Sequence, residues 1–395
     1  MGHRAGLTRR WEQKGRANSA GGGLRMLRVG VALAAGLALV AVAGCAGGAR
    51  PKSADGVASV GRGQTGSENG EGASRSTTGP ASDKASERTT ANGRSGVLNG
   101  ALFGGDVPLA EVEPGLGRPL AIVRDYYQLG ARFPYAADAK LMARGSTMLV
   151  SLDTVPGGPT YASIAAGRHD AVITAFLASV ERAAVRYGLG AIYIAFEHEA
   201  DTGPHHIGLG TPAQFASAWD HINQLAESMH LDWNQGGRLH WVWILTSGAF
   251  RQGIASEYWP GANEVDIVAV DGYNTGGCRH ARPGTNLVGL GNSVESPVEL
   301  FGAAISFART HGGLPVFIPE WGTIPYESSA VQPWYIQQMQ NYVTQNPEIA
   351  AALYWDNHGH SNGCDYTIDS HPASLSALAA MGRASALQGQ IVSAG

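Results

Sequence analysis

The sequence contains few cysteines, few charged residues and no hydrophobic run long enough to suggest a membrane span. Three cysteines in 395 residues exclude a scaffold that depends on many disulfides. Only 15% of the residues are charged and the formal net charge is −4, so the charge balance gives no case for a nucleic-acid partner. Neither G-x-G-x-x-G nor G-x-x-x-x-G-K-[ST] follows an early apolar run, which argues against a nucleotide-binding domain.

Glycine is the one residue in clear excess, with 55 of 395 positions, roughly twice the usual share. The composition is also uneven along the chain. Residues 46–96 contain no aromatic residue and almost no branched aliphatic one. Such a segment cannot bury enough apolar surface to offset its chain entropy. We therefore predict a disordered tether over residues 45–96, followed by one folded domain over residues 97–395.

The N-terminal 44 residues have the pattern of an export signal. Residues 1–28 are rich in arginine and contain a single acid, and the apolar run Val29–Ala43 follows. At ~1.5 Å per residue this run spans roughly 22 Å, short of a ~30 Å bilayer core. A basic flank, a short apolar run and small residues predict a signal peptide. Met26 is an alternative translation start.

The tetrad Val42-Ala43-Gly44-Cys45 resembles a bacterial lipobox. The resemblance implies cleavage before Cys45 and lipid attachment to its thiol. We therefore expect a lipoprotein on the outer face of the bacterial membrane, with secretion as the alternative and membrane contact through the lipid alone. A short uncleaved anchor is the other interpretation of the apolar run.

From Gly96 onward, short apolar runs alternate with helix-like segments. Eight strands alternating with helices over about 300 residues predict a (β/α)8 barrel, with a doubly wound open sheet as the alternative. The predicted strands are Ala101–Gly104, Leu120–Val123, Thr147–Leu152, Ala191–Phe196, Leu239–Leu245, Val265–Val270, Leu314–Ile318 and Ala351–Trp355. The predicted helices cover about 108–116, 134–144, 168–187, 211–229, 295–311, 329–345 and 372–386, and residues 250–258 are only weakly helical.

Acidic and aromatic residues follow several of the predicted strands. Glu199 follows the fourth strand and Glu320 follows the seventh, and in a barrel such strand ends meet at one rim. Retaining glycoside hydrolysis needs two carboxyl groups ~5–5.5 Å apart, one as acid and one as nucleophile. Tyr273, after the sixth strand, is placed to donate a hydrogen bond to the nucleophile and keep it charged.

Three motifs at these strand ends resemble glycoside hydrolase family 26. They are His198-Glu199, Glu320-Trp321-Gly322 and the pattern V-D-x-x-x-x-D-G-Y-N from Val265 to Asn274. The resemblance extends from about Leu102 to Trp355. It implies a retaining, endo-acting hydrolase of a β-linked polysaccharide, mannan-like or a related β-glycan, which needs no cofactor.

The resemblance also implies roles for single residues. Glu199 would be the acid/base, Glu320 the nucleophile and Tyr273 its hydrogen-bond partner. His198, Trp355 and Trp321 would contact the sugar, since aromatic rings suit the apolar faces of pyranoses. Glu197 is an alternative acid/base, because residues two apart on a strand share a face.

Two departures from the family pattern keep other functions open. Ala195 stands where the family has an arginine, and Ala200 follows Glu199 where the family has methionine. A carbohydrate-binding surface lipoprotein without turnover is one alternative, and a transglycosylase that remodels an envelope glycan is another. We expect a monomer whose partner is a polysaccharide or oligosaccharide.

Histidines and cysteines provide two further hypotheses. His205-His206, near His198, suggest a metal site as a minor alternative. His358 and His360 are considered as metal ligands in the same way. Once Cys45 is assigned to the lipid, Cys278 and Cys364 remain as a pair. They follow the sixth and eighth strands, over the same barrel mouth, and an exported location permits a disulfide between them.

Overall fold

The computed structural model describes residues 93–155, 157–202, 208–276, 278, 294–357 and 364–392. They belong to one compact unit within residues 75–395. The predicted signal peptide, the lipidation of Cys45 and nearly all of the tether lie outside the described residues. Within the described part of the chain, no helix combines the length and the hydropathy needed to span a bilayer.

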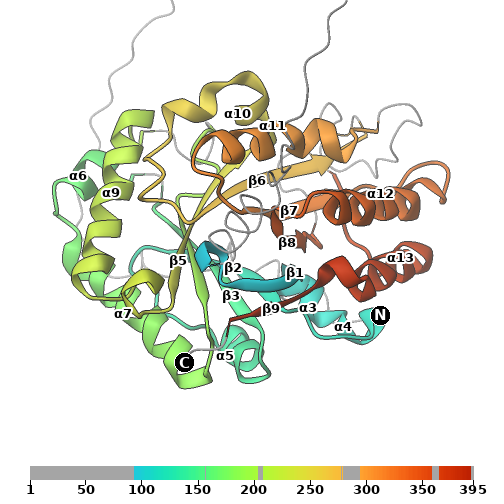
Figure 1. Ribbon diagram of the computed structural model, residues 1–395, viewed down its shortest axis with the longest axis horizontal. Helices are drawn as coiled ribbons and strands as arrows, with labels where there is room; N and C mark the ends of the chain where they lie inside the picture. Colours follow the sequence, from blue (N-terminus) through green and yellow to red (C-terminus); the bar gives the residue numbers. More distant parts are fainter. Residues whose placement is uncertain are drawn as a thin grey trace, which may run out of the picture. The chain divides into compact units, whose positions relative to one another are not determined.

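Eight parallel strands close into a barrel (Figure 1). From β2 to β7, each strand pairs with the strand that follows it in the chain. β1 pairs with both β8 and β2, which closes the barrel. The strands are β1 (Val97–Asp106), β2 (Ile122–Gln128), β3 (Thr147–Asp153), β4 (Ile192–Phe196), β5 (Leu239–Thr246), β6 (Ile267–Asn274), β7 (Val316–Thr323) and β8 (Ile349–Tyr354). This closure confirms the predicted (β/α)8 barrel and excludes the open sheet.

A ninth strand, β9 (Gln388–Ile391), pairs antiparallel with β1 and was not expected from the sequence. The chain also contacts the barrel slightly ahead of the predicted domain start at residue 97. The Tyr193 hydroxyl donates to the Ser95 carbonyl at 2.7 Å, and Arg94 donates to the Ala262 carbonyl at 2.9 Å. Contacts to the barrel therefore begin before β1.

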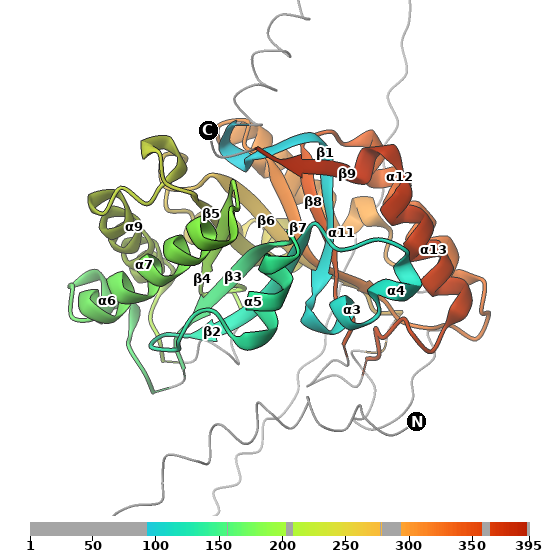
Figure 2. The same cartoon turned by 90° about the horizontal axis from the view of Figure 1, so that it is seen from below.

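Helices cover the outside of the strands, as Figures 1 and 2 show. The predicted helix over 108–116 is divided in two, because Pro114 lacks the N–H that a continuous helix would use. The weakly helical segment after β5 forms a short helix and a 3-10 turn. The elements are α3 (Val107–Glu111), α4 (Glu113–Leu116), α5 (Ala136–Ala143), α6 (Tyr161–Ala165), α7 (Asp170–Tyr187), α9 (Pro212–Ser228), η2 (Trp233–Gln235), α10 (Ser247–Gln252), η3 (Ile254–Glu257), α11 (Pro297–Thr310), α12 (Val331–Gln345), α13 (Pro372–Arg383) and η5 (Ser385–Leu387).

Two helices begin with the capping pattern that their sequence indicates. The Thr211 side chain accepts from the Gln214 N–H, and the Gln214 side chain accepts from the Thr211 N–H. Ser296 and Glu299 repeat this arrangement at the start of α11. In both helices proline occupies the first turn, where its missing N–H costs nothing.

Side chains fill the inside of the barrel, which leaves the strand ends as the place for a site. Tyr193 and Phe317 meet inside it with ring centroids 5.0 Å apart, in a cluster otherwise made of small and aliphatic residues. A larger apolar cluster lies between the strands and the helices. Because the interior is packed, a substrate site on this fold is expected at the barrel mouth, where the strands end.

The predicted disulfide is confirmed. Cys278 and Cys364 are bonded, with Cα atoms 5.6 Å apart and 86 positions between them in the sequence. Both are buried in a small cluster with Tyr326 and Tyr366. The bond ties the segment after β6 to the segment after β8 over the same end of the barrel.

Candidate active site

The segment after β4 has an unusual backbone. Glu197 and Glu199 both adopt left-handed conformations, with φ of 49° and 53°, which cost a non-glycine residue about 1–3 kcal/mol. The Glu197 N–H donates to the Leu152 carbonyl at 2.9 Å and the Glu199 N–H donates to the Ile244 carbonyl at 3.0 Å. The segment is thus held between the ends of β3 and β5, and strand alternation stops at Phe196.

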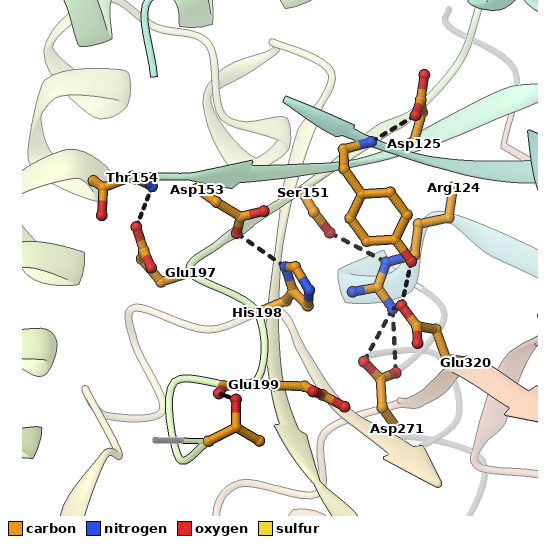
Figure 3. Close-up of polar contacts among 12 residues, drawn as sticks. Arg124, Asp125, Ser151, Asp153, Thr154, Glu197, His198, Glu199, Asp271 and Glu320 are labelled. Carbon is orange, nitrogen blue, oxygen red and sulfur yellow. Dashed lines mark hydrogen bonds and ion pairs between the residues drawn. The ribbon is translucent and has the colours of Figure 1, made fainter. Parts of the chain in front are cut away.

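This backbone turns Glu197 and Glu199 in different directions, as Figure 3 shows. Glu197 is 1% exposed, and its carboxylate accepts from the Thr154 N–H. Glu199 points toward Asp271 and Glu320. The alternative that Glu197 is the acid/base is therefore contradicted, because its carboxylate faces the β3 end and not the other acids.

Three carboxylates converge at the barrel mouth. Glu199 after β4, Asp271 on β6 and Glu320 on β7 each bring one oxygen within 4.8 Å of the others. The predicted pair of Glu199 and Glu320 is therefore close in space, although 121 positions separate the two residues in the sequence. Asp271 belongs to a motif that the sequence analysis quoted, but we had assigned it no role.

Each oxygen of the Glu320 carboxylate accepts a hydrogen bond from a phenol. Its Oε1 accepts from the Tyr126 hydroxyl, and its Oε2 accepts from the Tyr273 hydroxyl. Arg124 Nη1 lies 3.0 Å from Oε1. Glu320 is thus held by two phenol hydroxyls, one on each oxygen, and by the charge of Arg124.

Arg124 supplies the positive charge at the centre of the site. It is 1% exposed, and its Nη1 donates to both oxygens of Asp271, at 3.0 and 3.2 Å. Its Nε donates to the Ser151 hydroxyl at 3.1 Å (Figure 3). Carboxylates at this spacing would also suit a cation, but the guanidinium already lies against two of them.

The electrostatics of the site follow from burial and these charges. Burial lowers the pKa of Arg124, but Asp271, Tyr126 and Glu320 outweigh it and raise the pKa above its ordinary value. Burial, opposed by Arg124 and reinforced by Glu320, raises the pKa of Tyr126. Burial and the Glu320 charge raise the pKa of Tyr273 in the same way. Both phenols therefore stay protonated and act as donors.

His198 lies beside Glu199 and is held by an acid. Its Nδ1 is 2.9 Å from Asp153 Oδ1, at the end of β3. Burial lowers the pKa of His198, but Asp153 outweighs this and brings the pKa above its ordinary value. The ring also packs on Tyr126, with centroids 5.2 Å apart. His198 is thus fixed between β3 and β2 at the edge of the carboxylate cluster.

The two tryptophans that we expected to contact a sugar differ in position. Trp355 is half-buried and packs edge-on against Tyr273, with centroids 5.6 Å apart. Trp321 is 1% exposed and packs edge-on against Tyr354, in the cluster between strands and helices. The expectation that Trp321 stacks on a sugar is contradicted, because its ring has no open face.

Sequence reasoning missed Arg124, Tyr126 and Asp153. We predicted a second strand that ended at Val123, whereas β2 continues to Gln128 and pairs with β3 along its whole length. Residues 122, 124 and 126 then share one face, which is the inner one. The alternation of Arg124 and Tyr126 after an apolar run was the available signal.

Ala195 stands where the family has an arginine, but Arg124 supplies a guanidinium to the site. Ala195 is fully buried on β4 and is paired in register with Ser151 on β3. The Ser151 hydroxyl accepts from Arg124, which reaches the cluster from β2.

The histidine pairs His205-His206 and His358 with His360, considered as metal ligands, lie outside the described residues.

No protein-family model and no curated protein matches the chain. Among solved structures, it is similar to an endo-β-1,4-mannanase of glycoside hydrolase family 26 from Cellulomonas fimi, with 16% identity over 78% of each chain and a TM-score of 0.51. A family 26 β-mannanase from Bacteroides ovatus has 13% identity over 76% of this chain and 94% of its own, with a TM-score of 0.54. The protein GH26C from Muricauda sp. has 11% identity over 76% and 89%, with a TM-score of 0.53. The chain therefore has the fold of the family 26 mannanases.

Proposed function

We propose that the chain is a divergent family 26-type glycoside hydrolase, retaining and endo-acting on a β-linked polysaccharide. The observation that carries the proposal is the approach of Glu199 and Glu320 to within 4.8 Å, oxygen to oxygen, at the end of a barrel with the family's fold. This close approach of two oxygens supports a retaining mechanism, in which the carboxyl groups lie ~5–5.5 Å apart, over an inverting one, in which they lie ~6.5–9.5 Å apart.

The donors around the carboxylates assign the two roles. Tyr126, Tyr273 and Arg124 all contact Glu320, which supports Glu320 as the nucleophile. Its oxygen forms a bond to the anomeric carbon while the glycosidic C–O bond breaks, and Glu199 gives its proton to the leaving oxygen. Glu199 then takes a proton from water, whose oxygen bonds to the anomeric carbon and releases Glu320.

The substrate is proposed from the neighbours and from the edge of the cluster. The proteins from Cellulomonas fimi and Bacteroides ovatus are mannanases, so β-mannan is the first substrate to test. His198 packs against Tyr126 and Trp355 packs against Tyr273, the two tyrosines that donate to Glu320. We assign both to contacts with the sugar.

The test measures reducing ends released from a panel of β-glycans by the wild type and by Glu199→Ala and Glu320→Ala. We expect both variants to lose activity by at least about 1,000-fold, because each removes a reacting group. The exposed Glu257 provides a matched control, and Glu257→Gln should retain wild-type activity. Hydrolysis that persists in either alanine variant would contradict the assigned roles.

Product analysis separates the alternatives. Proton NMR of the first product should give the β-anomer, and added azide should rescue Glu320→Ala with an α-glycosyl azide. Longer oligosaccharides than the substrate would indicate a transglycosylase. Glycan binding without any turnover would indicate a carbohydrate-binding surface lipoprotein.

We also propose that the protein is exported and held at the outer face of the membrane by a lipid on Cys45. The support is the basic N-terminus, the apolar run Val29–Ala43 and the lipobox-like tetrad that ends at Cys45. Mass spectrometry of the membrane fraction should find Cys45 at the mature N-terminus with a diacylglyceryl group. A Cys45→Ser variant that stays in the membrane in the same amount would contradict the lipid anchor.

A further inference from the structure

Tyr126 contacts the nucleophile from a strand that the sequence analysis did not connect with it. It lies two residues after Arg124 on β2, so both side chains enter the barrel mouth from the inner face. The Tyr126 hydroxyl donates to Glu320 Oε1, and Arg124 Nη1 lies 3.0 Å from the same oxygen. A hydrogen bond from Tyr126 and the charge of Arg124 therefore converge on Oε1.

The two oxygens of Glu320 differ in what remains available to a substrate. A carboxylate oxygen has two lone pairs. Oε1 accepts the Tyr126 hydrogen bond and also forms an ion pair with Arg124. Among the described residues, Oε2 has one hydrogen-bond donor, the Tyr273 hydroxyl. Oε2 thus retains the lone pair that a new covalent bond requires.

The ring of Tyr126 is held from two sides. Arg124 Cζ lies 5.0 Å from the ring centroid, and the His198 ring lies 5.2 Å away at an interplanar angle of 56°. His198 in turn is bonded to Asp153 at 2.9 Å. A continuous series of contacts thus runs from Asp153 through His198, the sequence neighbour of Glu199, and Tyr126 to Glu320.

We propose that Tyr126 is a positioning residue that, with Arg124, holds Oε1 of Glu320 and so makes Oε2 the attacking atom. The inference rests on the proposed function, in which Glu320 is the nucleophile. Oε2 forms the bond to the anomeric carbon as the glycosidic bond breaks and its oxygen takes the Glu199 proton. Oε1 becomes the ester carbonyl oxygen and keeps the Tyr126 hydrogen bond and the contact with Arg124. When water displaces the ester, the negative charge returns to a carboxylate whose donors are already in place.

The neighbouring Tyr127 provides a matched control. It has the opposite orientation on β2, fully buried among the residues between barrel and helices. Its hydroxyl donates to Asp138 and accepts from the Tyr135 N–H at 2.8 Å. Tyr127→Phe therefore removes a buried hydroxyl from the same strand without touching Glu320.

The first experiment needs no substrate. In protein labelled with 13C at glutamate carboxyl carbons, the Glu320 signal is identified by its loss in Glu320→Gln, and its pH titration is followed. One charge-assisted hydrogen bond corresponds to a shift of about one to two pH units. Tyr126→Phe should move the Glu320 midpoint upward by about that amount, and Tyr127→Phe should leave it in place. An unmoved midpoint in Tyr126→Phe overturns the proposal.

The second experiment follows turnover. Tyr126→Phe should lower kcat/KM about 10- to 100-fold, mainly through kcat, and should move the acid limb of the pH profile upward with the NMR midpoint. Tyr127→Phe should lower thermal stability and leave the acid limb of the pH profile unchanged. A wild-type pH profile in Tyr126→Phe refutes the positioning role even if the enzyme is active. A wild type that hydrolyses no glycan refutes the proposed function, while the NMR midpoint still decides whether Tyr126 holds the nucleophile's charge.

Discussion

Replacement of Arg124 by methionine tests whether the guanidinium holds the carboxylate cluster together. Methionine has a similar length and no charge, so the packing volume is nearly kept. The change leaves Asp271 and Glu320 buried, with oxygens within 4.8 Å of each other and no cation between them. We expect the variant to lose stability because two like charges then face each other in a site from which water is largely excluded.

The size of the effect follows from that distance. At an effective dielectric constant of about 20, two unit charges within 4.8 Å of each other repel by at least about 3.5 kcal/mol. Uptake of a proton by Asp271, whose pKa burial already raises, limits the loss. Removal of one partner from a buried ion pair typically costs about 3–5 kcal/mol. We therefore expect the free energy of unfolding of Arg124→Met to fall by about 3–5 kcal/mol, measured by urea denaturation at pH 7.

A double-mutant cycle separates this effect from lost packing. In Arg124→Met with Asp271→Asn, one of the two unpaired charges is gone. The double variant should therefore lose at least about 2 kcal/mol less than the sum of the single variants. The exposed pair of Arg309 and Glu348 provides the control, and Arg309→Met should cost less than about 1 kcal/mol. Additive losses, or a loss below 1 kcal/mol in Arg124→Met, would refute the assigned role.

Three further predictions concern the disulfide, a glycine and a buried histidine. Replacement of Cys278 and Cys364 by serine should lower the free energy of unfolding by about 2–4 kcal/mol in urea titrations, and an unchanged value would mean that the bond does not constrain the unfolded chain. Gly272→Ala should cost about 1–3 kcal/mol, because a Cβ there would lie 2.9 Å from Phe301 Cε1; wild-type stability of this variant would show that Phe301 yields freely. Burial lowers the pKa of His240 to about 4, so the unfolded chain, with a histidine pKa of ~6.5, takes up a proton first as the pH falls. The stability from neutral His240 is complete above pH 6.5, and about 2 kcal/mol of it should be lost between pH 7.5 and 5. The wild type minus His240→Gln difference in unfolding free energy isolates this loss, and a flat difference would contradict it.

The barrel was predictable because its signal is local and repeated. Each parallel strand is buried on both faces, so it appears as an apolar run such as Thr147–Leu152, and helix starts such as Thr211-Pro212 carry their caps in the sequence. The elements that the sequence analysis failed to predict lack that signal. Strand β9 at the chain's end is short and half-exposed, and the polar second half of β2 has no apolar run to mark it.

The candidate site was predictable in part. Glu199, Glu320 and Tyr273 each lie two or three positions after an apolar run, so their place at a strand end could be inferred from the chain alone. Arg124, Tyr126 and Asp153 belong to strands that extend past their apolar part, and the sequence analysis left them in loops. The orientation of Glu197 was also out of reach, because it depends on a left-handed backbone at φ 49° that strand alternation does not predict.

The sequence by itself determined which residues lie at strand ends, which cysteines pair and that eight strands alternate with helices. These features depend on hydrophobic periodicity and chain order, which are written in the linear sequence. Only the tertiary structure decided which side chains face one another across the barrel mouth. Barrel closure brings β2, β4, β6 and β7 to one rim, and a buried arginine from one strand then lies against carboxylates from two others. That convergence depends on strand length and register. Neighbouring strands fix both through their hydrogen bonds, so neither can be read from a single segment of the sequence.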